Sequence, residues 1–174
     1  RSVATMALCE AAAYYKTKDM TLWDAMIEMY ERYGYYKDDI QSITLKGIED
    51  LKDPGILETL RKNPPAEIAG YKVLKARDYK ADTIQDMQTG EVSSTGLPTS
   101  NVLYYDLSDE CMVMCETVGT EPKVKFYYGI KGTSLSDADE KSAAMGREVL
   151  AMIDKLCKNV AVIVNSTALH GKYC

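Results

Sequence analysis

The sequence predicts an α+β fold: a mostly antiparallel sheet with helices packed on one face, preceded by a helical hairpin. Stretches with alternating polarity, typical of half-buried strands, cluster in the middle of the chain between 102 and 130. Apolar residues at helical spacing instead mark the two ends, at 3–33 and from about 136 onward. The 174 residues, 46% of them hydrophobic, suffice for one packed domain, or for one domain with a remnant of another.

The N-terminal hairpin is predicted from residues 1–34. Residues 3–16 are Ala-rich and apolar on nearly all sides, which predicts a well-buried helix. Thr21 and Asp24 have the spacing of a capping box, which opens a second helix. Gly34 is expected to end that helix as a left-handed cap.

The segment after Gly34 is predicted to alternate between strands and short helices. Polarity alternates around 42–46, which indicates a strand, and Asp53-Pro54 is expected to open a helix that Pro64-Pro65 ends. A further strand is expected at 71–76. Residues 77–100 have no strong period and carry several Gly, Ser and Pro residues, which predicts a long loop.

Three strands are predicted next, at 102–107, 111–118 and 123–130, followed by a long helix and, at 160–174, a short strand and a tail. The strand at 123–130 has the clearest pattern. Its apolar side chains are expected to face the core, and Lys123, Lys125 and Tyr127 the opposite side. The core-facing residues are Val124, Phe126, Tyr128 and Ile130.

Charge and cysteine usage exclude several classes of protein. A net charge of −5 argues against nucleic acid as a partner. No apolar run is long enough to cross a bilayer, and no secretory signal precedes the first helix, so we expect no membrane partner and a cytoplasmic location. The five cysteines form no C-x-x-C pair, which predicts reduced thiols and no metal site.

The turn at 119–122 is the candidate binding site. Gly119 permits positive φ, so that successive amides can point into one concavity, and Thr120 adds a hydroxyl donor. Lys123 and Lys125 leave the turn on the exposed face, and together these groups could hold a phosphate. A plain hairpin turn is the alternative, and the residue types alone favour it, because Gly, Thr and Pro are common in turns.

The stretch GTEPKVKFYYGIKG resembles the C-terminal motif of the α-D-phosphohexomutases, the family of phosphoglucomutase and phosphomannomutase. The resemblance covers about residues 1–158 and is clear in the stretches at 21–36, 42–51, 63–73 and 95–107. It implies a four-domain isomerase that moves a phosphoryl group between C1 and C6 of a hexose. It also implies a phosphoserine in the first domain, Mg²⁺ in the second, and a fourth domain that resembles half of the TATA-binding protein and grips the non-reacting phosphate.

The chain carries only part of that pattern. It has no Ser-His-Asn-Pro nucleophile motif, no Asp-Gly-Asp metal loop and no Glu-Glu-Ser sugar loop. We therefore interpret 1–34 as a helical remnant of the third domain and 35–174 as the C-terminal phosphate-binding domain. No catalytic residue and no cofactor are expected in this chain, Mg²⁺ is expected in the full-length parent, and hexose phosphate is expected to bind together with the parent's other domains. The apolar hairpin at 1–34 is a candidate dimer surface.

Two residues depart from the family motif. The resemblance assigns phosphate contacts to the positions of Glu116, Val118, Gly119 and Thr120, and the family has Arg and Ser at the first two. A carboxylate about 4 Å from a phosphate is repelled by about 1 kcal/mol per unit charge in water and about 4 kcal/mol at an effective dielectric constant of 20. Three explanations stay open: an altered sequence, a binding module that kept the scaffold but lost phosphate affinity, or an outward-turned Glu116 with a cation supplied by another domain.

Overall fold

The computed structural model describes residues 2–45, 56–117, 123–156 and 162–164. Its strands hydrogen-bond in the order β5-β4-β3-β6-β7-β8-β1-β9, and β2 pairs with β3. Every strand pair is antiparallel, as the sequence predicts. The strands are β1 (Tyr35–Leu45), β2 (Glu67–Ile68), β3 (Tyr71–Asp78), β4 (Thr83–Asp86), β5 (Val92–Ser93), β6 (Val102–Leu107), β7 (Met112–Thr117), β8 (Lys123–Gly132) and β9 (Val162–Val164). The α-helices are α1 (Ser2–Lys16), α2 (Leu22–Tyr33), α3 (Ile56–Lys62) and α4 (Leu135–Leu156).

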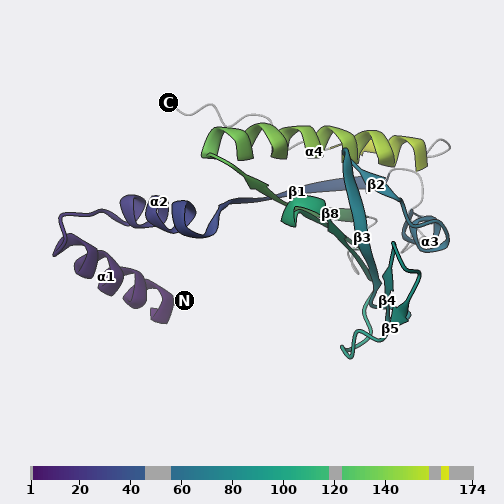
Figure 1. The fold of residues 1–174 in the computed structure, drawn as a ribbon, viewed down its shortest axis with the longest axis horizontal. Coiled ribbons are helices and arrows are strands. Elements are labelled where there is room, and N and C mark those ends of the chain that lie inside the picture. Colours follow the sequence, from purple (N-terminus) through teal and green to yellow (C-terminus); the bar gives the residue numbers. More distant parts are fainter. Residues whose placement is uncertain (1, 46–55, 118–122, 157–161, 165–174) are drawn as a thin grey trace.

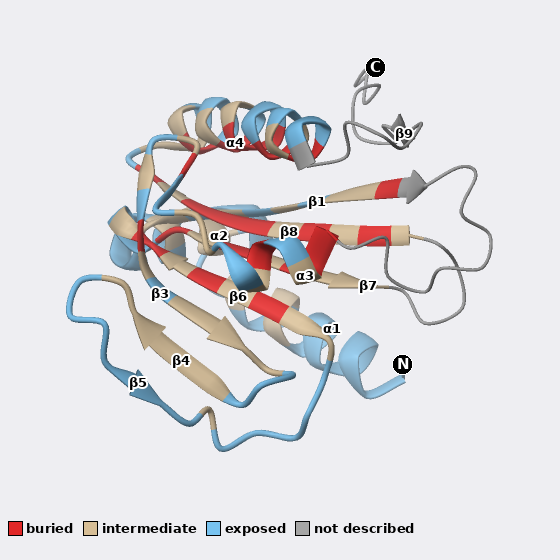
Figure 2. Ribbon diagram, turned by 90° about the vertical axis from the view of Figure 1, so that its right-hand side faces the viewer, coloured by how far each residue is buried: buried red, intermediate tan, exposed pale blue. Residues whose placement is uncertain are grey.

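The core lies between α4 and one face of the sheet. Helix α4 packs along β8 and β1, and α3 contacts α4 and β6 (Figure 1). Buried residues line the strands beneath α4, whereas α1 and β5 are largely exposed (Figure 2). The predicted two-residue period of β8 is confirmed, because Val124, Phe126 and Ile130 are fully buried. Helix α4 contributes three buried side chains to this core, which are Met145, Val149 and Ile153.

Strand β1 is longer than the sequence pattern indicated. It begins at Tyr35, directly after Gly34, and pairs with β8 from Tyr35↔Gly132 to Thr44↔Lys123. One face of β1 therefore lies under α4, and the other belongs to the open face of the sheet. The predicted helix start at Asp53-Pro54 lies outside the described residues.

The helical hairpin forms as predicted, with two differences. The capping box is present, since the Thr21 amide donates to Asp24 Oδ2 over 2.8 Å and the Asp24 amide donates to Thr21 Oγ1 over 3.2 Å. Gly34 has a φ of 110° with an extended ψ of 156°, so its conformation is not the predicted left-handed cap, although the positive φ still favours glycine.

The expected burial of the first helix is wrong. No residue of α1 is buried, and Val3 and Met6 are 80% and 71% exposed. The reason is geometric: α1 lies beside α2, away from the sheet and α4 (Figure 1), so its apolar surface meets no core. Neither α1 nor any other described helix is both long and apolar enough to cross a membrane.

The predicted loop at 77–100 is partly wrong, because β4 and β5 form within it. The carboxylate of Asp82 organises the rest of this segment. It accepts hydrogen bonds from the Ser94 hydroxyl over 2.6 Å, the Thr95 amide over 2.9 Å and the Gly96 amide over 3.2 Å. These donors, the Ser94 hydroxyl first, hold the pKa of Asp82 below its ordinary value.

This anchoring predicts a pH dependence that is local to the segment. A lowered folded-state pKa means that the carboxylate stabilises the fold fully above the unfolded pKa of about 3.9, and that this contribution is lost as the pH falls through the folded value. The protection factors of the Thr95 and Gly96 amides, which compare the measured exchange rate with the intrinsic rate at the same pH, are therefore expected to be high at neutral pH and to fall in acid below about pH 4. In Asp82→Ala, exchange at both amides should be fast even at pH 7, whereas Glu91→Gln should leave it unchanged. Slow exchange in Asp82→Ala would contradict this role of Asp82.

Candidate anion-binding site

Only one of the four predicted site residues lies in the part of the chain that the structure describes. Val118, Gly119 and Thr120 lie outside the described residues, whereas Glu116 lies near the end of β7. Strands β7 and β8 pair up to Thr117↔Val124, so residues 118–122 connect two neighbouring antiparallel strands, as the sequence predicts. The residues that lead into and out of the predicted turn can therefore be placed.

Glu116 lies on the open face of the sheet and is bonded to β8. Its cross-strand partner is Lys125, and its Oε1 accepts a hydrogen bond from the Tyr127 hydroxyl over 2.8 Å. Tyr127 pairs with Met114, so it lies farther from the 118–122 connection than Lys125 does. The carboxylate is thus directed back along the sheet, away from the connection, which agrees with the outward-turned Glu116 of the third explanation. The same hydrogen bond raises the pKa of Tyr127.

The charge beside the connection is mixed. Lys125 and Ser42 are cross-strand neighbours on the open face, and Lys125 also has Glu116 opposite it on β7. A cation and an anion of unit charge on facing positions attract each other and weaken the field that either presents to a ligand. The open face at this point is therefore less attractive to an anion than the two predicted lysines alone would make it.

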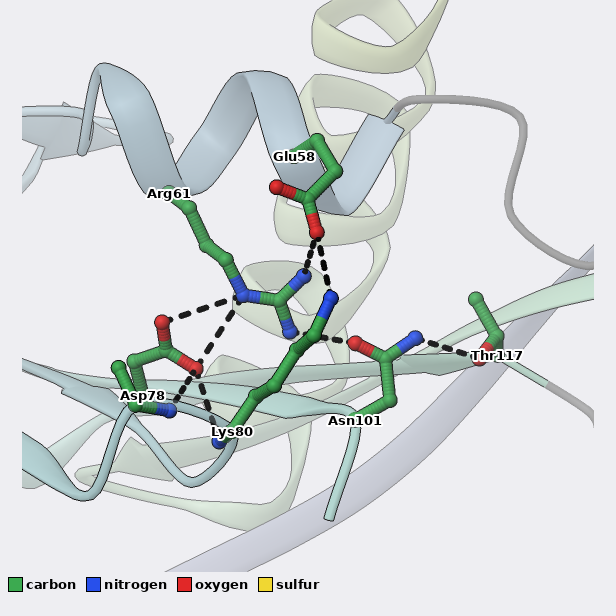
Figure 3. A network of polar contacts seen from close by, with 7 residues as sticks. Glu58, Arg61, Asp78, Lys80, Asn101 and Thr117 are labelled. Atoms are coloured by element: carbon green, nitrogen blue, oxygen red, sulfur yellow. Dashed lines mark hydrogen bonds and ion pairs between the residues drawn. The ribbon is translucent and has the colours of Figure 1, made fainter. Parts of the chain in front are cut away.

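A network of polar side chains reaches the same end of the sheet from the helical side (Figure 3). The side-chain amide nitrogen Nδ2 of Asn101 donates to Thr117 Oγ1 over 2.9 Å. The guanidinium of Arg61, on α3, donates to the side-chain oxygen Oδ1 of the same Asn101. Arg61 also forms an ion pair with Asp78 at 3.1 Å. Thr117, the last residue of β7, is thereby connected to α3 through two side chains.

Arg61 is committed to this network and is not available to a ligand as a free cation. Besides Asp78 and Asn101, it contacts Glu58 Oε1 at 2.8 Å, and Lys80 reaches the same oxygen at 2.9 Å. The Arg61 side chain is only 10% exposed. Neither Arg61 nor Asn101 was identified from the sequence, because partners that are 17 and 40 residues apart leave no local signal.

The described residues contain no group of three or more His, Cys, Asp or Glu side chains placed to hold a metal ion.

Comparison with known proteins identifies the family. Phosphoglucomutases from Staphylococcus aureus strains RF122, MRSA252 and N315 are 35%, 34% and 33% identical to this chain, in each case over 135 residues. This chain belongs to the phosphohexomutase family. The matched residues make up 77% of the chain but only 24% of each relative, so the chain spans about a quarter of the length of these curated phosphoglucomutases. No protein-family profile matches the chain.

The family assignment agrees with the C-terminal motif and with the fold. The stretch that carries the motif begins in β7 and continues through β8, and its apolar positions are those that face α4. The match is consistent with the C-terminal part of a phosphohexomutase.

Proposed function

We propose that this chain acts as the C-terminal, substrate-phosphate-binding domain of a phosphoglucomutase or phosphomannomutase that interconverts hexose 1-phosphate and hexose 6-phosphate. The observation that supports it is the similarity to phosphoglucomutases, together with the Gly119-Thr120 connection between two paired strands. In this proposal the backbone amides and the Thr120 hydroxyl hold the phosphate that does not react. The nucleophilic serine and the Mg²⁺ site are supplied by the parent enzyme's other domains.

A second candidate function is a binding module that has kept the scaffold but lost phosphate affinity. Glu116 favours it, since a carboxylate stands where the family has a bidentate arginine, one of the strongest phosphate ligands in proteins. The contact with Tyr127 turns this carboxylate away from the connection, which lessens the repulsion but does not replace the missing cation. For the chain as it stands, the proposal therefore includes weak binding, with a Kd for glucose 6-phosphate of millimolar or above.

Restoring the family residues tests whether the connection at 118–122 can hold a phosphate. Glu116→Arg with Val118→Ser is expected to tighten binding of glucose 6-phosphate by about 100-fold, since one charge-assisted hydrogen bond contributes roughly 1.5–3 kcal/mol. Amide shifts of Gly119 and Thr120 during the titration report occupancy of the connection itself. Glu91→Arg is the matched control, because it changes the net charge equally at an exposed position in another part of the domain.

The outcomes are distinct. Tighter binding with shifts at Gly119 and Thr120 supports the phosphate-binding role. Unchanged shifts in the double variant would remove that role from the connection and favour the binding-module alternative. Equal tightening in Glu91→Arg would mean that net charge, and not the site, governs binding.

A cytoplasmic location is part of the same proposal. It is supported by Cys9 and Cys111, which form no disulfide, as is usual in a reducing compartment. Recovery of the protein from the periplasmic or extracellular fraction of expressing cells would contradict this location.

A further inference from the structure

The helical hairpin of α1 and α2 carries most of the exposed apolar surface of the described residues. Of the twelve large apolar side chains that are exposed there, eight lie on these two helices, and neither helix has a buried residue. The eight are Val3, Met6, Leu8, Tyr14, Leu22, Trp23, Met29 and Tyr33. A contiguous apolar surface of this kind marks an interaction site in a soluble protein.

Helix α2 gathers its apolar side chains on one face, which we call the α2 stripe. The stripe consists of Leu22, Met26, Met29 and Tyr33. Their i, i+4, i+7, i+11 spacing places all four on a single side of the helix. At the same spacing the acidic residues Asp24, Glu28 and Glu31 fall on the opposite side. The stripe is therefore apolar from end to end and carries no charge.

Helix α1 has an open apolar side as well. Its half-buried residues share one side of the helix, and they are Ala11, Ala12 and Tyr15. Helical spacing places Val3, Met6 and Tyr14 on the other side. From Ser2 to Lys16 the helix has charges only at Glu10 and Lys16, so its surface loses little hydration when a partner covers it.

The hairpin extends away from the sheet, so that a partner can reach both helices. It joins the sheet at the start of β1, where the rings of Tyr30 and Tyr35 stack at 5.7 Å between their centroids. Helix α4 lies over β8 and β1 and leaves α1 and α2 uncovered (Figure 1). A partner therefore displaces no described element when it docks on the hairpin.

The open apolar area is sufficient for a dimer. An aromatic side chain covers about 150–250 Å² when fully buried, so exposures of 39–80% leave on the order of 100 Å² for each of the eight side chains. The hairpin thus offers roughly 800 Å², the share of one partner in a standard interface. If two thirds of this area is covered, two copies together still bury about 1,000 Å², which a specific interface requires.

We propose that the hairpin joins two copies of this chain, with the α2 stripes packed antiparallel about a two-fold axis. This arrangement places Leu22 of each copy near Tyr33 of the other, and brings the methionines together at the axis. An uncharged stripe meets no like-charge repulsion when it packs against itself, and antiparallel helices align their dipoles favourably. The proposal does not depend on the phosphate-binding function.

The test is the mass of the full chain by sedimentation equilibrium. At about 100 μM the protein is expected to be mainly a dimer, twice the 19.4 kDa of the chain. Met29→Glu should weaken self-association by at least about 100-fold, because the two-fold axis places the buried charge in the interface twice. Leu97→Glu is the matched control: this residue is 56% exposed, against 53% for Met29, and lies outside the hairpin, so the dimer should persist.

A mixing experiment identifies the second copy as the partner. Met29→Glu and Met29→Lys should each be monomeric and helical, since Glu and Lys are strong helix formers. An equimolar mixture of the two variants should recover the dimer, because opposite charges then meet near the axis.

Three results would overturn the proposal. A chain that stays monomeric at about 100 μM would leave the stripe as a surface for a different protein or for another part of the parent enzyme. A mass that grows beyond the dimer with concentration would exclude a closed two-fold interface. Equal weakening by Met29→Glu and Leu97→Glu, or a mixture that stays monomeric, would show that the α2 stripes do not meet.

Discussion

Arg61→Met is expected to lower the free energy of unfolding by about 3 kcal/mol, at the lower end of the range for breaking a buried ion pair. The arginine is 10% exposed and its partner Asp78 is 17% exposed, so water can replace little of what the guanidinium provides. Methionine preserves most of the aliphatic stem, which confines the change largely to the charged head. Urea denaturation of the parent and the variant measures the difference.

Arg77 is a matched control for this prediction. It binds Asp106 through Nε at 2.7 Å and Nη2 at 2.8 Å, a geometry at least as good as that of Arg61 with Asp78. The Arg77–Asp106 pair is more accessible, however, with side chains 34% and 28% exposed. Since exposed pairs contribute about 0–1 kcal/mol, Arg77→Met should cost at most about 1 kcal/mol.

A partner substitution separates the burial of an uncompensated charge from other effects. In the Arg61→Met background, Asp78→Asn removes the carboxylate that the first change leaves without its cation, and part of the lost stability should return. Equal losses at Arg61 and Arg77, with no recovery in the double variant, would show that burial does not control the contribution of these pairs.

The strands next to the candidate site could be predicted because the alternation of apolar and polar residues within each strand shows which of its faces is buried. In β8, apolar residues alternate with Lys123, Lys125 and Tyr127. This alternation indicates which side of the strand faces the core without any knowledge of the other elements. The cross-strand position of Glu116 and Lys125 follows from the same alternation once the connection is known. The Tyr127 contact that redirects Glu116 does not follow, because it depends on side-chain reach across the strand pair.

Other features depend on partners that no local pattern specifies. The apolar character of α1 predicts burial, but burial needs an opposing layer, and in this structure its apolar side chains remain exposed. Strands β4 and β5 are short and polar, too brief for a period, and the segment beyond them is anchored by the single carboxylate of Asp82. Likewise, the buried Gln41 Oε1 and Ser142 Oγ have no hydrogen-bond partner among the described residues, and the sequence could not show this because it depends on how closely α4 approaches β1.

At the end of β8, where the strand faces the start of α4, Gly132→Ala is expected to destabilise the protein by about 3 kcal/mol or more, the upper end for overpacking a core. A Cβ at Gly132 would lie 2.6 Å from the Ala138 nitrogen and 2.8 Å from its Cα. Both are backbone atoms of α4, so no side-chain rotation relieves the clash and the helix itself must move. Thermal and urea unfolding measure the loss, and an unchanged m-value would show that the native state stays compact.

Gly129→Ala in the same strand is the control. There the new Cβ meets Asp38 Oδ1 at 3.0 Å and Met112 Cγ at 3.1 Å, which are side-chain atoms that can give way, so a cost below about 1 kcal/mol is expected. Similar losses for the two variants would mean that α4 shifts freely along the sheet. If Gly132→Ala is the costlier change and also alters the amide shift of Ser142, the contact at Gly132 helps to set the distance between α4 and β1.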